Sequence, residues 1–186
     1  MSTLAGTAGK LGLINSTGAS AQFNSPAGIT TDGTYIYVAD SGNNAIRKIT
    51  ISTGAVSTLA TGFKGPLRIT TAGTNLYVAD TQNNAIVAIS ASGAVTTISS
   101  GLLNLPTAIT YNGIDLYVAD SGNNRIVQLS VSGAVLKSNF ASVPSPQGIT
   151  YDGISFYVTS GTSSLSNFTQ NSLATRTCWS NLALIF

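Results

Sequence analysis

The chain has 186 residues and carries 8 basic and 6 acidic side chains, so its formal net charge is only +2. It contains no histidine and a single cysteine, which excludes a histidine general base, an imidazole metal site, an internal disulfide and a cysteine zinc cluster. The small net charge argues against a surface built to bind nucleic acid or an anionic membrane.

The first predicted element lies at the N-terminus. Residues Met1–Ala5 align with Val56–Ala60, so residues 1–8 are expected to form the last strand of a unit whose other strands lie elsewhere. No signal peptide is visible there, and no apolar run reaches the roughly 18 residues of a membrane span. The sequence does not fix the compartment, although the few charges and the single thiol weakly favour a secreted or cell-envelope protein.

From residue 26 onward the sequence repeats with a period of 40 residues. A proline, an isoleucine, a glycine and a tyrosine recur, at Pro26, Pro66, Pro106, Pro146, Ile29, Ile69, Ile109, Ile149, Gly33, Gly73, Gly113, Gly153, Tyr37, Tyr77, Tyr117 and Tyr157. A Val-Ala-Asp triplet ends at Asp40, Asp80 and Asp120, and an Asn-Asn pair follows each triplet. This many matches at one offset exclude chance and indicate a repeat architecture.

Within a unit the pattern predicts strands. Residues Tyr35–Ala39 are aromatic and β-branched and lack the 3.6-residue periodicity of a helix. Turn signals bound four short strands in the first unit, which we expect at about 28–31, 35–39, 45–51 and 55–60. Because the connecting loops are too short for crossovers, neighbouring strands must be antiparallel.

A repeated four-stranded antiparallel unit of this length is typical of a β-propeller blade. We therefore predict an all-β propeller of about four blades over residues 1–172, followed by a divergent tail at 173–186. The expected blades lie at about 26–62, 66–101, 106–142 and 146–172. Two arrangements stay open: the strand at 1–8 completes the last blade and closes the ring, or the blades form an open arc that self-associates through its exposed edges.

The repeated motif resembles the NHL repeat. It reads Pro-x-Gly-Ile-Thr-x-Asp-Gly and then Tyr-Val-Ala-Asp-Ser-Gly-Asn-Asn-x-Ile, and it is carried by residues 26–46, 66–86, 106–126 and, in its first half, 146–158. The resemblance implies a propeller that typically has six blades, so an open arc would be a piece of a larger ring. The arginine that the family has before the last isoleucine is present only as Arg125, and Thr159-Ser160 replaces Ala-Asp in the fourth unit.

The repeated aspartates Asp40, Asp80 and Asp120 have two interpretations. A ring of carboxylates binds a divalent cation, whereas an aspartate after a strand accepts backbone N–H groups two residues further on. Because blades lie apart around a ring, we interpret the three as structural turn residues and predict no metal or other cofactor. Gly33, Gly73, Gly113 and Gly153 are expected to supply positive φ angles in the turns between the first and second strands, and the Asn pairs to adopt left-handed or turn conformations.

Non-repeated positions indicate binding better, because the architecture does not require them. Antiparallel pairing places the loop before the first strand and the loop after the second strand of every unit on one face. This face gathers the candidate ligand-binding residues Asn43, Lys64, Arg68, Gln82, Asn83, Asn123 and Gln147. Arg68 stands out, because small residues fill the equivalent positions, although it could instead cap a nearby carbonyl or reach solvent. Arg47 and Lys48 are also unrepeated, and we interpret them as a solvated outer edge.

The leading functional hypothesis is a non-enzymatic scaffold that binds a protein, peptide or glycan through this face. One alternative is a lactonase-like, metal-dependent propeller hydrolase, which the resemblance to propeller enzymes suggests but the lack of glutamate disfavours. Another is an incomplete fragment of a larger NHL protein without independent function. Binding of nucleic acid is not expected, because the eight basic residues are scattered along the chain.

Overall fold

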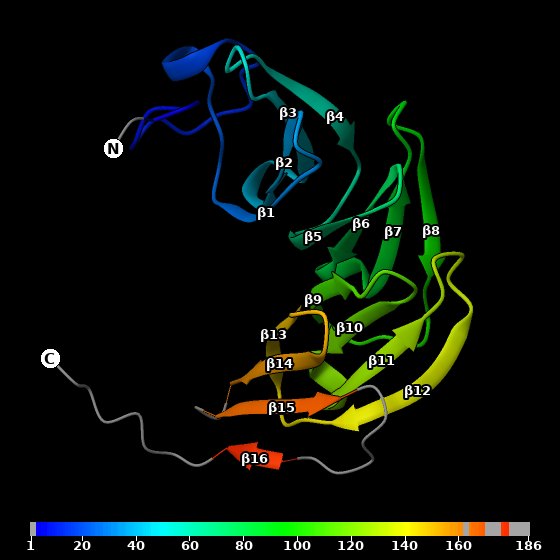
Figure 1. The fold of residues 1–186 in the computed structure, drawn as a ribbon. Helices are drawn as coiled ribbons and strands as arrows, with labels where there is room; N and C mark the ends of the chain where they lie inside the picture. The colour runs from blue at the N-terminus through cyan, green and yellow to red at the C-terminus, as the bar shows by residue number, and fades with distance from the viewer. Residues whose placement is uncertain (1–2, 162–163, 170–175, 179–186) are drawn as a thin grey trace, which may run out of the picture.

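The computed structural model describes residues 3–161, 164–169 and 176–178, which form four antiparallel sheets of four strands each (Figure 1). We call these sheets blades one to four, in chain order. Blade one contains β1 (Pro26–Thr31), β2 (Tyr35–Asp40), β3 (Ala45–Thr50) and β4 (Val56–Thr61). Blade two contains β5 (Pro66–Ala72), β6 (Asn75–Asp80), β7 (Ala85–Ile89) and β8 (Val95–Ser99).

Blades three and four follow the same strand order. Blade three contains β9 (Pro106–Tyr111), β10 (Leu116–Asp120), β11 (Arg125–Leu129) and β12 (Val135–Ser142). Blade four contains β13 (Pro146–Tyr151), β14 (Ser155–Ser160), β15 (Leu165–Thr169) and β16 (Arg176–Cys178). Single 3-10 turns are η1 (Gly18–Ser20), η2 (Ser41–Asn43), η3 (Thr81–Asn83) and η4 (Ser121–Asn123).

The blades pack face to face because both faces of their central strands are apolar. Side chains alternate between the two faces of a strand, so Tyr37 and Ala39 of β2 point toward blade two, whereas Val38 points the other way. Tyr37 and Ala39 are buried against Ile69 and Val78 of blade two. Equivalent clusters fill the spaces between blades two and three and between blades three and four.

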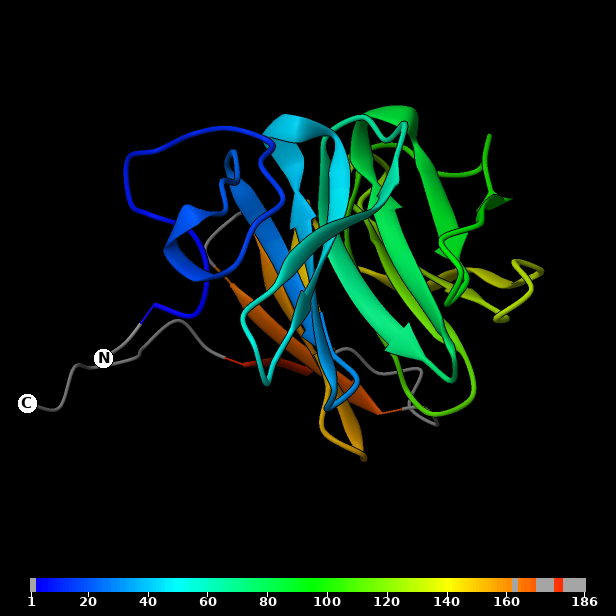
Figure 2. The same ribbon diagram turned by 90° about the horizontal axis from the view of Figure 1, so that it is seen from above.

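The first strands β1, β5, β9 and β13 lie innermost and contact one another in chain order. The blades therefore follow one another around a common axis, which is visible from two directions in Figures 1 and 2. The prediction of an all-β propeller with four antiparallel four-stranded blades is confirmed. Among the described residues, no core cluster joins blade four to blade one, and Figure 1 shows these two blades separated.

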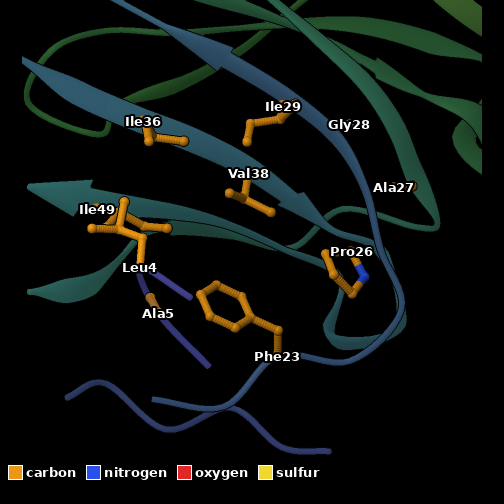
Figure 3. A pocket seen from close by; sticks show the side chains of 10 residues that line it. All are labelled: Leu4, Ala5, Phe23, Pro26, Ala27, Gly28, Ile29, Ile36, Val38 and Ile49. Atoms are coloured by element: carbon orange, nitrogen blue, oxygen red, sulfur yellow. The ribbon is translucent and has the colours of Figure 1, made fainter. Parts of the chain in front are cut away.

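The N-terminal segment does not close the ring. Residues 3–8 contain no strand, and the fourth strand of blade four is β16, which lies in the tail that was expected to fall outside the repeats. The reason is that apolar side chains of the segment pack against blade one instead. Leu4 and Ala5 approach Phe23 over the face that carries Val38 (Figure 3).

This N-terminal cover leaves part of blade one open. Ala21 is fully buried against Val38 and Ile49, and Phe23 packs beside them. A cavity of about 410 Å³ lies next to Phe23, and Ile29 on its wall is 70% exposed. The equivalent Ile69, which has blade one in front of it, is only 6% exposed. Blade one therefore presents an apolar face of the kind that meets a preceding blade elsewhere in the molecule.

Candidate functional site

A carboxylate at the end of the second strand fixes the loop that precedes each of the first three blades. Asp40, Asp80 and Asp120 are buried, and each accepts a backbone N–H at 2.7 Å, from Asn24, Lys64 and Asn104 respectively. These donors lie 16 residues earlier in the chain, and not two residues later as an Asx turn would have them. In the described part of the chain, no three acidic, histidine or cysteine side chains gather as metal ligands would.

The two asparagines after each aspartate have different partners. The first donates from Nδ2 to the aspartate Oδ2, at 2.8, 2.7 and 2.9 Å for Asn43, Asn83 and Asn123. The second has left-handed φ angles of 52, 53 and 54° and accepts the N–H of a residue before the next blade, in the pairs Asn44–Gly65, Asn84–Leu105 and Asn124–Ser145. We call each aspartate with its two asparagines a loop clamp. Three of the predicted ligand-binding residues thus use amide donors inside this framework.

Two arginines reinforce the loop clamps. In blade three, Arg125 donates from Nε to Asp120 Oδ2 at 2.8 Å and from Nη2 to the Leu102 carbonyl at 2.9 Å. In blade one, Arg47 donates from Nη1 to Asp40 Oδ2 at 2.8 Å, and both side chains are fully buried. Arg47 stands two residues later than Arg125 in its repeat, which places it on the same face of its strand.

The prediction that Arg47 lies on a solvated edge is wrong, because the N-terminal segment covers it. Its guanidinium donates to the carbonyls of Gln22 and Ile14, at 2.8 and 3.0 Å. It also lies 4.9 Å from the centroid of the Phe23 ring. The segment before blade one therefore supplies both the polar partners and the apolar cover that a buried cation needs.

A cavity of about 300 Å³ opens on the axis, on the side of the propeller that carries the loop clamps. All four blades contribute to this axial cavity, through Ala27, Leu67, Arg68, Thr107, Gln147, Gly148 and Thr159. The structure thus brings together two of the predicted binding residues, Arg68 and Gln147. Lys64 and Gln82 are exposed but do not line the cavity.

Arg68 is the charged residue of the axial cavity. Its Nη1 donates to the Ala27 carbonyl at 2.5 Å, so it does cap a carbonyl, as the alternative interpretation held. A guanidinium has five N–H donors, and the side chain is exposed, so further donors are available to a ligand. Gln147 Nε2 lies 3.3 Å from Ser145 Oγ. No acidic residue belongs to the described lining, so the cavity favours acceptor or anionic groups.

The opposite side of the propeller carries the turns between first and second strands. Gly33, Gly73, Gly113 and Gly153 have φ angles of 89, 60, 100 and 101°, a region that glycine adopts without strain. Before Gly33, Asp32 Oδ1 accepts the backbone N–H groups of Thr34 and Tyr35, at 2.9 and 2.7 Å. Here the Asx geometry expected for the repeated aspartates is found at a different aspartate.

No known family profile matches this sequence, and no curated protein matches it significantly. Solved structures do match its fold. The catalytically inactive virginiamycin B lyase from Staphylococcus aureus, solved with quinupristin, is 26% identical with a TM-score of 0.71, and the match covers 83% of this chain and 55% of that one.

Two further structures have different roles. An auxiliary nutrient binding protein from Bacteroides thetaiotaomicron is 14% identical with a TM-score of 0.74, over 89% of this chain and 44% of that one. A chain of a nidogen/laminin complex is 14% identical with a TM-score of 0.60, over 82% and 80% of the two chains. The chain therefore spans about half the length of the lyase and of the nutrient binding protein. At 14% identity, the likeness to the nutrient binding protein and to the nidogen/laminin chain concerns the fold alone.

None of the helices in the described ranges has the length and apolar character needed to cross a bilayer.

Proposed function

We propose that this chain is a non-enzymatic binding module that holds a polar protein, peptide or glycan partner at the axial cavity. The observation that carries the proposal is the position of Arg68, an exposed cation in a cavity to which every blade contributes and whose described lining has no acidic residue. A planar guanidinium recognises carboxylate and other acceptor pairs by paired hydrogen bonds. The nutrient binding protein and the nidogen/laminin complex support the idea that related folds serve binding.

The enzymatic alternatives have less support. The virginiamycin B lyase structure is of a variant in which a histidine-to-alanine change makes the enzyme catalytically inactive, and the present chain has no histidine. None of the 186 residues can therefore take the place of that histidine. A lactonase-like hydrolase would need oxygen ligands around one cation, whereas Asp40, Asp80 and Asp120 each bind the loop of their own blade.

The test uses a panel of labelled peptides with free C-terminal carboxylates and an array of glycans. Each ligand found is then titrated against Arg68→Ala, with Lys64→Ala as the matched control, since Lys64 is an exposed cation on the same side but outside the cavity. We expect Arg68→Ala to weaken binding at least tenfold, which is about 1.4 kcal/mol, and Lys64→Ala to change little. Equal affinity for the wild type and Arg68→Ala would contradict the proposal.

A second candidate role is that of one part of a larger propeller. It is supported by the apolar face of blade one, where Ile29 is 70% exposed, because a preceding blade would present the same tyrosine, alanine and isoleucine that pack on Ile69. Light scattering on this chain, beside a chain extended by further repeats, tests it. We expect this chain to associate and the extended chain to be monodisperse; a stable monomer of this chain with an unchanged melting temperature on extension would contradict it.

A further inference from the structure

The contact between blade one and blade two differs from the contact between blade two and blade three. In blade two, Tyr77 Oη reaches across and donates to the Val131 carbonyl of blade three at 3.1 Å. In blade one, the equivalent Tyr37 Oη donates to Asp32 Oδ2 of its own blade at 2.8 Å. Alanine occupies the position of Asp32 in blade two, as Ala72, so Tyr77 has no such partner there.

The Tyr37 hydroxyl thus bonds within its own blade, and the space between the first two blades is open at this point. A cavity of about 330 Å³ lies there, on the side opposite the loop clamps, and we call it the interblade cleft. Ala91, which corresponds to Val131 in the repeat, lines it. The cleft is thus the space that a tyrosine bridges between the next two blades, and its volume reaches the lower end of the range of ligand cavities, roughly 300–1,000 Å³.

Two of the residues that line the cleft on the side of blade one, Tyr35 and Lys48, are not repeated. Tyr35 has Asn75, Asp115 and Ser155 at its equivalent positions, and Lys48 has Ala88 and Gln128. The Lys48 Nζ lies 3.6 Å from the centroid of the Tyr35 ring, and the Tyr35 and Tyr37 rings are 6.3 Å apart. The fold forms in the other blades without these side chains, so their presence in blade one needs another explanation.

The polar groups of the cleft balance one another. Lys48 supplies one positive charge and Asp32 one negative charge, and the rest of the polar lining consists of threonine hydroxyls, tyrosines and the Asn75 amide. The backbone N–H of Tyr35, as the largest cause, holds the pKa of Asp32 below its usual range, so this carboxylate is charged at neutral pH. A lining of zero net charge that offers both donors and acceptors suits a neutral ligand with many hydroxyl groups.

We propose that the interblade cleft is a second binding site and that it takes a neutral sugar, either a single pyranose or the end of a glycan chain. A sugar hydroxyl is both a donor and an acceptor, so one hydroxyl accepts from Lys48 Nζ while its neighbour donates to Asp32. Lys48 Nζ covers one face of the partly buried Tyr35 ring, so the C–H groups of the pyranose would contact the part of the ring that Lys48 leaves free. This site is independent of the axial cavity, which lies on the other side of the propeller.

The test titrates the protein with the methyl glycosides of glucose, galactose, mannose and N-acetylglucosamine, observed through backbone amide chemical shifts. We expect at least one glycoside to shift the amides of Tyr35, Asn75 and Ala91 in a saturable way, with a Kd of about 1–10 mM. Lys48→Met and Asp32→Asn should each weaken binding at least tenfold, whereas Arg68→Ala should leave it unchanged. Asp32→Asn could disturb the turn that Asp32 stabilises. Lys48→Met keeps the proposal testable in that case, because none of the hydrogen bonds among the described residues involves the Lys48 side chain.

Two outcomes would overturn the proposal. The first is the absence of saturable shifts at these amides for all four glycosides at concentrations up to about 50 mM, which is well above the expected Kd. The second is binding that Arg68→Ala abolishes and Lys48→Met does not, since the sugar would then occupy the axial cavity. Loss of the axial function alone would leave the cleft titration unaffected, so failure of the two proposals can be told apart.

Discussion

Ser160 Oγ donates a hydrogen bond to the carbonyl of Pro144 at 2.6 Å, and this bond runs in the opposite direction to its counterparts. At the position of Ser160, the other three blades have an aspartate that accepts a backbone N–H. At the position of Pro144 they have residues that donate it. Because proline has no N–H, an aspartate in blade four would find no donor there, and a serine hydroxyl restores the contact by donating instead.

This pairing predicts a coupled effect of two substitutions. Ser160→Asp should lower the free energy of unfolding by about 1–3 kcal/mol, because it brings a carboxylate to a buried position without its donor. Pro144→Asn combined with Ser160→Asp rebuilds the Asn24–Asp40 arrangement and should recover most of that loss. Urea unfolding of the wild type, both single variants and the double variant measures the coupling. Strict additivity of the two single effects would contradict this explanation.

The two arginines that pair with loop-clamp aspartates should differ in their effect on stability. Arg47→Met leaves Asp40 buried without its cation, so we expect a loss of about 3–5 kcal/mol. Arg125 is 20% exposed, so Arg125→Met lets water reach Asp120 and should cost only about 1–2 kcal/mol. Chemical denaturation of both variants makes the comparison, with Lys48→Met as a control next to Arg47. Equal losses for the two arginine variants would show that the N-terminal cover does not desolvate Arg47.

The second asparagine of each pair combines a backbone requirement with a hydrogen bond. Asn84→Gly keeps the left-handed backbone but removes the acceptor for the Leu105 N–H, so it should cost about 0.5–1.5 kcal/mol. Asn84→Ala removes the same acceptor and adds left-handed strain of about 1–2 kcal/mol. In both variants the Leu105 amide should exchange its hydrogen faster. An unchanged exchange rate at Leu105 would mean that the bond between blades two and three is not formed in solution.

The Tyr37 hydroxyl gives the protein a stability term at alkaline pH. Burial, as the larger cause, and the hydrogen bond to Asp32 raise the pKa of Tyr37 from 10.0 to about 12. Because the folded-state pKa is above the unfolded value, this contribution is complete below pH 10 and is lost as the pH rises toward about 12. The wild type should therefore lose more stability than Tyr37→Phe over this interval, as measured by melting temperature against pH. Parallel curves for the two proteins would contradict the assignment.

The fold could be predicted from the repeated residues. The surroundings of unrepeated residues such as Arg47 could not be predicted from the sequence. The 40-residue spacing of Pro26 and Ile29 with their equivalents predicts blades, because every blade solves the same packing problem. The burial of Arg47 depends on Phe23 and on the carbonyls of a segment outside the repeats. Such a contact between a repeat and its flanking segment leaves no periodic signal in the sequence.

Only part of the axial cavity could be predicted from the sequence. Arg68 and Gln147 both line the axial cavity, because antiparallel pairing alone puts their loops on one side. The role of Asn43 in binding Asp40 required side-chain geometry, although the strict pairing of Asp with Asn-Asn was a usable signal. The interblade cleft was missed, because it depends on which of two partners a repeated tyrosine contacts.

Successive loop clamps bind neighbouring residues just before a repeated proline. Asn44 of blade one accepts the N–H of Gly65, and Asp80 of blade two accepts the N–H of Lys64. If Gly65 were joined directly to Pro106, the clamp bonds at the new junction would be kept, because Asn44 would still face Gly65 and Asp120 would take the place of Asp80. Shortening or duplicating the chain in steps of one unit at this point therefore conserves the bonds between each remaining clamp and the loop that it holds. Gene rearrangement can thus change the number of blades without any substitution in the residues that form the clamp bonds.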